Sequence, residues 1–108
     1  MTKKEESNGI IFVSYKEDDR GRQLKPAMKY GTAVLIQATK NETVHIKARG
    51  RAIRKAVDVS QIAVNKLLKD WEVKDVKIGT ELTKRKFKDS KEEKEVSVSF
   101  IDIELGKK

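Results

Sequence analysis

A run of cations around one glycine is the part of this sequence best suited to chemistry with a charged ligand. Residues 47–59 contain five basic residues before their first acid, Asp58. These are Lys47, Arg49, Arg51, Arg54 and Lys55. Gly50 lies inside the run and fits a turn between a strand and a helix, because glycine allows a close backbone approach or a positive φ. A helix N-terminus also presents unpaired N–H groups and the positive end of the helix dipole. Fixed cations beside such a terminus favour a polyanion as ligand.

The position of these cations has a cost. Basic residues at a helix N-terminus are slightly unfavourable, because they face the positive end of the dipole. Arg51, Arg54 and Lys55 impose this cost with no evident local compensation, which favours a role in binding. The alternative is a basic helix start whose charges are solvated.

Lys25 marks a second cationic helix entrance. It precedes Pro26, which suits the first turn of a helix because its missing N–H costs nothing there. This entrance and the one after Gly50 both follow parallel strands of the predicted sheet. Ligands of such sheets gather at the carboxyl ends of the strands. Taken alone, however, Lys25 is better explained as an ordinary surface lysine.

A third group of cations lies in residues 83–94, where Phe87 is the one apolar side chain. We predict a long hairpin loop that stands clear of the body. Its cations Lys84, Arg85 and Lys86 could follow a phosphate backbone or enter a minor groove. The alternative is a solvated charge run whose field the neighbouring acids reduce.

The elements that position these residues follow from hydrophobic periodicity. We predict strands at 10–15, 43–48, 73–82 and 95–105, and helices at 26–39 and from Gly50 to 69. The last strand changes phase near Phe100, so either a bulge lies there or both faces are covered. Residues 16–23 form a charged loop with Gly21 as its turn residue, and residues 1–8 form a disordered tail.

The resulting order is β-α-β-α-β-β. Right-handed crossovers would place both helices on one face of a small mixed four-stranded sheet, an α/β (α+β) fold. The length predicts a single domain, which we assign to residues 9–108.

The composition favours an anionic partner. The 108-residue chain is 39% charged and carries a formal net charge of +8. Such a balance favours nucleic acid first, and an anionic membrane or an acidic protein second. The alternative is a solvated or heat-adapted surface, since hyperthermophile proteins are enriched in Lys and Glu.

Several function classes are excluded by what the sequence lacks. It has no cysteine and one histidine, which leaves no thiolate chemistry, zinc cluster or conventional triad. It also has no G-x-x-x-x-G-K-[ST] phosphate loop. We therefore expect no enzyme activity, metal, cofactor or small-molecule substrate. No apolar run approaches the ~18 residues of a membrane span, and residues 1–8 have no apolar signal-peptide core. We expect a cytoplasmic protein without a membrane contact.

Read together, these residues resemble the Alba family of small basic chromatin proteins from archaea. The resemblance rests on residues 46–53, Ile-Lys-Ala-Arg-Gly-Arg-Ala-Ile, and their continuation over 55–59. It is supported by residues 25–30, by Ile-Gly-Thr at 78–80 and by the closing strand at 98–105.

The resemblance implies a fold like the C-terminal domain of translation initiation factor three. It also implies a homodimer, or a heterodimer with a paralogue, that coats and compacts double-stranded DNA on the chromosome and often binds RNA. Alternatives are a mainly RNA-binding role, in RNA coating or as an accessory subunit like those of ribonuclease P, and a protein–protein scaffold. By match, Lys25, Arg49 and Arg51 would form the central nucleic-acid surface. The hairpin cations Lys84, Arg85 and Lys86 would lie on arms that reach along the duplex.

Three departures from the family pattern accompany the resemblance. Leu24 replaces the first of the two lysines that the family usually has before the proline. Regulation by lysine acetylation at this place would therefore depend on Lys25. The loop at 16–23 is longer than usual, and its Arg20 and Arg22 could restore the lost charge. Leu67 stands where many members carry a phenylalanine used between dimers.

Overall fold

The computed structural model describes residues 9–22, 25–86 and 93–108. The predicted tail at 1–8 lies outside the described residues, as do Leu24 and the hairpin segment 87–92.

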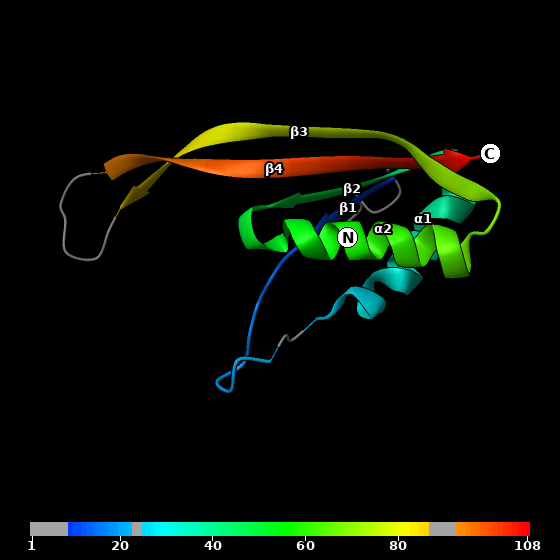
Figure 1. Ribbon diagram of the computed structural model, residues 1–108, viewed down its shortest axis with the longest axis horizontal. Helices are drawn as coiled ribbons and strands as arrows, with labels where there is room; N and C mark the ends of the chain where they lie inside the picture. The colour runs from blue at the N-terminus through cyan, green and yellow to red at the C-terminus, as the bar shows by residue number, and fades with distance from the viewer. Residues whose placement is uncertain (1–8, 23–24, 87–92) are drawn as a thin grey trace.

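Four strands form one mixed sheet, which confirms the predicted fold class (Figure 1). They are β1 (Ile10–Val13), β2 (Thr43–Arg49), β3 (Trp71–Lys86) and β4 (Glu93–Lys107). The strand order is β1-β2-β4-β3, with β1 parallel to β2, and β4 antiparallel to both of its neighbours β2 and β3. The carboxyl ends of β1 and β2 therefore meet at the same edge.

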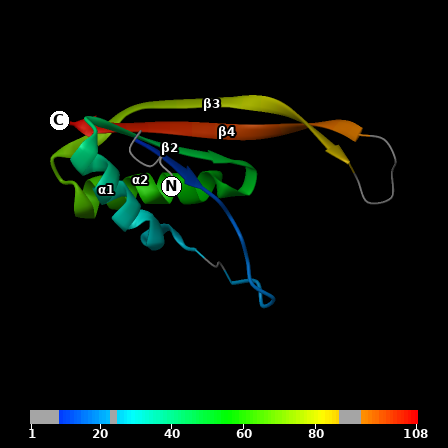
Figure 2. The same ribbon diagram turned by 180° about the vertical axis from the view of Figure 1, so that it is seen from behind.

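Both helices cover one face of this sheet (Figures 1 and 2). The first begins with a 3-10 turn, η2 (Ala27–Tyr30), and continues as α1 (Gly31–Lys40). The second begins with η3 (Gly50–Ala52), continues as α2 (Ile53–Ile62) and ends in a π turn, η4 (Ala63–Leu67). We call the opposite side of the sheet the open face.

The core lies between β2, β4 and the helices. In β2 the alternate residues Val44, Ile46 and Ala48 are buried. Their partners across the ladder are Leu105, Ile103 and Ile101, which are also buried. Because side chains alternate between faces, a slip of one residue would turn His45 and Lys47 into the core. This pattern fixes the register of β2, and so the position of Arg49 at its end.

The predicted hairpin loop was wrong at both ends. β3 continues to Lys86 and β4 starts at Glu93, so Lys84 pairs with Glu95 inside a long two-stranded ribbon. This ribbon projects beyond the helices (Figure 1). The ribbon covers no core, so its strands do not need alternating apolar residues. The polar sequence therefore gave no strand signal at 83–86 and 93–94.

Of the two alternatives for the phase change near Phe100, the bulge was wrong. The register is continuous through Phe100 on both sides of β4, and the shift lies between Val73 and Asp75 instead. Ile101 faces the helices and is buried, whereas Phe100 faces the open side. The phase change in the sequence therefore marks the point where apolar residues switch faces.

Candidate nucleic-acid interface

The site is built where the parallel strands β1 and β2 end. Val13 pairs with Ala48, so Ser14 and Tyr15 leave the sheet beside Arg49 and Gly50. Gly50 has a φ of 56°, which confirms the predicted turn. An L side chain is strained at this φ. The turn sends the chain directly into η3, which carries Arg51.

Lys55 anchors this edge from beneath. It is 4% exposed, and its Nζ donates a hydrogen bond to the Ser14 carbonyl oxygen over 2.8 Å. The same ammonium lies 5.1 Å from the centre of the Tyr15 ring. A buried cation is stable only when it is paired in this way. This placement indicates a structural role and argues against the direct phosphate contact that the sequence predicted.

Tyr15 and Glu17 hold Arg51, and sequence reasoning missed both. The Arg51 guanidinium lies 4.5 Å from the centre of the Tyr15 ring and 3.5 Å from Glu17 Oε2. The Tyr15 hydroxyl donates a 2.6 Å hydrogen bond to Glu17. That bond is the main reason the pKa of Tyr15 lies above its usual value. The one signal in the sequence was that Tyr15 continues the alternation of Ile11 and Val13 past the end of β1.

Lys25 reaches the same edge from the first helix. Its Nζ lies 4.4 Å from the centre of the Tyr30 ring, which is itself buried. The Tyr30 hydroxyl accepts a 3.1 Å hydrogen bond from the Ser14 backbone N–H. Burial would raise the pKa of Tyr30, but the hydrogen bonds with Ser14 and the nearby ammonium of Lys25 outweigh it, so the pKa is lowered. Ser14 thus ties both helix entrances to the end of β1.

The remaining cations of the run have carboxylate partners within the chain. Arg49 lies 3.7 Å from Glu81, Arg54 lies 3.9 Å from Asp58, and Lys47 lies 3.8 Å from Asp102. Arg49 and Arg54 are exposed. Exposed pairs at such distances contribute about 0–1 kcal/mol each. A phosphate can therefore displace these carboxylates at little cost.

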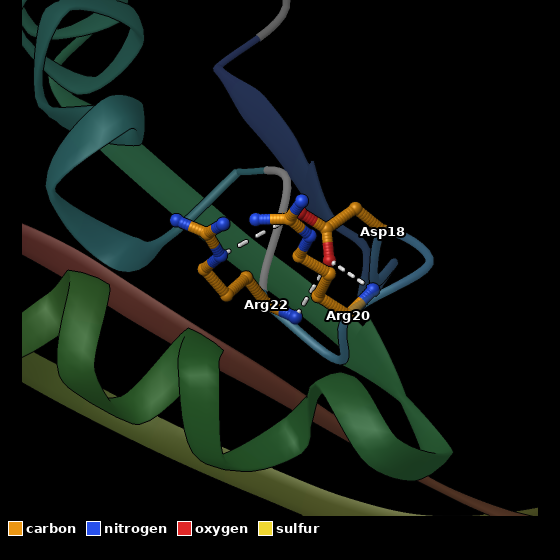
Figure 3. A network of polar contacts seen from close by, with 3 residues as sticks. All are labelled: Asp18, Arg20 and Arg22. Carbon is orange, nitrogen blue, oxygen red and sulfur yellow. Dashed lines mark hydrogen bonds and ion pairs between the residues drawn. The ribbon is translucent and has the colours of Figure 1, made fainter.

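The loop after β1 is an ordered turn (Figure 3). Asp18 Oδ1 accepts hydrogen bonds from the backbone N–H groups of Arg20 and Arg22, both over 2.9 Å. Gly21 has a φ of 80°, which confirms it as the turn residue. The Arg22 side chain lies 3.9 Å from Asp18 Oδ2, and both arginines are exposed. The loop thus presents two cations away from the sheet.

The structure brings some predicted residues together and separates others. Lys47, Arg49, Arg51 and Lys84 line one hollow at the end of β2. Lys25 lies at the entrance of the first helix, and Arg20 and Arg22 lie on their own loop. Arg85 and Lys86 follow Lys84 along the ribbon. We call the group Lys25, Arg49 and Arg51 the cationic edge.

Residues 9–22, 25–86 and 93–108 contain no cluster of three or more His, Cys, Asp or Glu side chains that could hold a metal ion. No helix in the same part of the chain is long and apolar enough to cross a membrane.

Comparison with known proteins decides the family. A family model described as Alba matches residues 22–80, which is more than half of the chain. The chain belongs to the Alba family. It is 47% identical over 85 residues to "DNA/RNA-binding protein Alba 1" of Archaeoglobus fulgidus, covering 78% of this chain and 89% of that protein. It is 43% identical over 84 residues to "DNA/RNA-binding protein Alba" of Methanothrix thermoacetophila, covering 77% and 88%.

Solved Alba structures have the same architecture. Alba from Thermoplasma volcanium matches with a TM-score of 0.68 and 32% identity, covering 91% of this chain and 99% of that one. ALBA1 from Trypanosoma brucei matches with a TM-score of 0.61 over 92% of this chain and 68% of that one. Its 19% identity supports the fold alone.

The departure from the Alba pattern at position 67 lies within the described residues. Leu67 is partly exposed in η4. Its Cδ1 would lie 3.1 Å from a Cβ built on Gly31 in α1. The glycine therefore makes room for this leucine, which packs along the first helix.

Proposed function

We propose that this Alba protein is a non-enzymatic, chromosome-associated protein that coats and compacts double-stranded DNA as a homodimer, and that it also binds RNA. The proposal is supported by the end of β1, where Arg51 stacks on Tyr15 and Lys25 stacks on Tyr30, whose hydroxyl accepts a hydrogen bond from the neighbouring Ser14. The names of two relatives at 43–47% identity, both DNA/RNA-binding proteins, support it.

The cationic edge fits a phosphate backbone better than it fits base edges. Arg49 and Arg51 are exposed guanidiniums that can bind phosphate oxygens with two parallel hydrogen bonds. Affinity would come from phosphate neutralisation and counterion release, with little dependence on sequence.

The dimer is supported by apolar side chains that this chain leaves uncovered. On β3, Ile78 is 77% exposed, and Val76 and Leu82 are also exposed. Val76 and Ile78 pair with the buried Ile103 and Ile101, so they lie on the helix-bearing face, beyond the helices. A row of this kind on one strand is typical of an interface. A second copy of the chain is the occupant that we propose.

The dimer is tested with Ile78→Asp, measured by sedimentation velocity. The matched control is Lys77→Asp, because Lys77 is the exposed neighbour on the opposite face of the same strand. We expect a monomer for Ile78→Asp and a dimer for the control. A wild-type protein that sediments as a monomer at all concentrations contradicts the dimer.

Nucleic-acid binding is tested by fluorescence anisotropy on duplex DNA, with Arg49→Ala as the probe. The control is Lys69→Ala, which also removes one positive charge. Lys69 is exposed and lies near the far end of the second helix. We expect Arg49→Ala to weaken every duplex sequence alike, and the control to have little effect. Loss of affinity for one sequence only contradicts backbone binding. Competition by a structured RNA at matched salt tests the RNA ligand.

A further inference from the structure

The open face of the sheet carries two phenylalanines beside the cations of β2. Phe12 in β1 is 73% exposed and pairs with Lys47. Phe100 in β4 pairs with Arg49. Both helices lie on the other face (Figures 1 and 2). Strand spacings of ~4.8 Å and a rise of ~3.3 Å per residue place the two Cα atoms about 12 Å apart.

Phe100 lies across its neighbouring strand. A Cβ built on Gly79 in β3 would lie 2.7 Å from Phe100 Cζ and 2.8 Å from Cε2. The ring therefore occupies the space that a side chain at position 79 would take. This contact holds the ring against the sheet and half-buries it, while Phe12 remains without such cover.

Charged residues surround the rings in one hollow. Phe12 and Phe100 line it together with the cations Lys47, Arg49, Arg51 and Lys84. Two carboxylates, Glu81 and Asp102, also line it. Each lies within 4 Å of a cation, Glu81 of Arg49 and Asp102 of Lys47. The hollow thus has more cations than carboxylates in its lining, together with the two rings.

A positively charged groove with exposed aromatic rings matches the chemistry of a single nucleic-acid strand. Unpaired bases stack on aromatic side chains while cations follow the backbone, and four-stranded sheets are used in this way. The paired bases of a duplex do not expose their faces, so a duplex cannot use the rings. The aromatic rings therefore distinguish the two forms of nucleic acid.

We propose that the open face binds single-stranded nucleic acid, with bases stacked on Phe12 and Phe100 and phosphates held by Lys47 and Arg49. The inference deepens the proposed function and rests on it, because Arg49 belongs both to this face and to the cationic edge. Phe12 and Phe100 belong to the open face alone. Substitutions of the rings therefore separate the two surfaces.

The test compares a labelled oligo(dT) strand of about 15 nucleotides with a duplex of equal length. We expect Phe12→Ala and Phe100→Ala to weaken oligo(dT) binding roughly tenfold each, and duplex binding by less than about twofold. Ile36→Ala, which truncates an exposed apolar residue of α1, is the matched control and should change neither.

A second variant guards against misfolding, because Phe100 is half-buried. Trp71 is 3% exposed, so Phe12→Trp adds an indole whose environment differs from that of the native one. We expect oligo(dT) to quench this added emission and the duplex to leave it unchanged.

Each other outcome has one meaning. The open-face site is overturned if the alanine variants bind oligo(dT) and duplex as the wild type does and oligo(dT) does not quench Phe12→Trp. The proposed function is left standing by that result. A changed oligomeric state in Phe12→Ala assigns the face to a second copy and also overturns the site. Failure of the wild type to bind either nucleic acid overturns the proposed function itself.

Discussion

We predict that the carboxylate of Glu81 competes with phosphate for Arg49, so that removing its charge strengthens binding. Arg49 and Glu81 lie 3.7 Å apart with exposed side chains. An exposed pair of this kind contributes about 0.2–1 kcal/mol. The proposed dimer would contain it twice, so Glu81→Gln would free about 0.4–2 kcal/mol, which is roughly a two- to thirtyfold gain in affinity for duplex DNA.

The assay is anisotropy on one duplex at several salt concentrations. Glu72→Gln is the matched control, because it removes the same charge from another paired glutamate. Glu72 accepts a 2.8 Å hydrogen bond from Lys74, which lowers its pKa, and neither residue lines the hollow. We expect the gain with Glu81→Gln to exceed that of the control clearly, and to shrink as salt rises, because salt screens the added attraction. Equal gains for both variants would show that net charge alone matters and would refute the local competition.

Three further predictions concern the residues that build the site. Lys55→Ala should lower the free energy of unfolding by about 1–3 kcal/mol in urea denaturation, because it leaves the Ser14 carbonyl without its donor. The control Arg54→Ala changes an exposed residue and should lower the free energy of unfolding by less than about 0.5 kcal/mol; equal losses would contradict the anchoring role of Lys55. Gly79→Ala should cost about 1–3 kcal/mol through its clash with Phe100, and most of that loss should vanish in a Phe100→Ala background; an additive double variant would exclude the contact. Gly50→Ala should cost about 1–2 kcal/mol because of its positive φ, and a neutral effect would contradict the turn.

The sheet and its helices could be predicted because their signals are local. Val44, Ile46 and Ala48 alternate with polar residues, and one face of such a strand must be buried. Gly50 and Gly21 were identified as turn residues from their neighbours, and both have positive φ. The Alba motif was also legible in the sequence, and the family comparison confirms it.

The burial of individual charged side chains and their contacts with residues distant in sequence could not be predicted in the same way. In the sequence Lys55 is one more cation of a basic run. A lysine side chain is amphipathic, so it can bury its stem and still pair its charge, and the sequence does not distinguish this from an exposed lysine. Its acceptor, Ser14, is 41 residues away in sequence. The contact of Tyr15 and Glu17 with Arg51 likewise depends on β1 and β2 ending side by side. The contacts of Lys25, Arg49 and Arg51 with nucleic acid remain predictions.

A salt-resolved titration of duplex DNA tests the central claim most directly. If Lys25, Arg49 and Arg51 of both protomers engage, about six phosphates are neutralised, and the slope of log K against log salt concentration is near −5. In Arg49→Ala the slope should become shallower by about two units, one per protomer. A wild-type slope near zero would contradict the account.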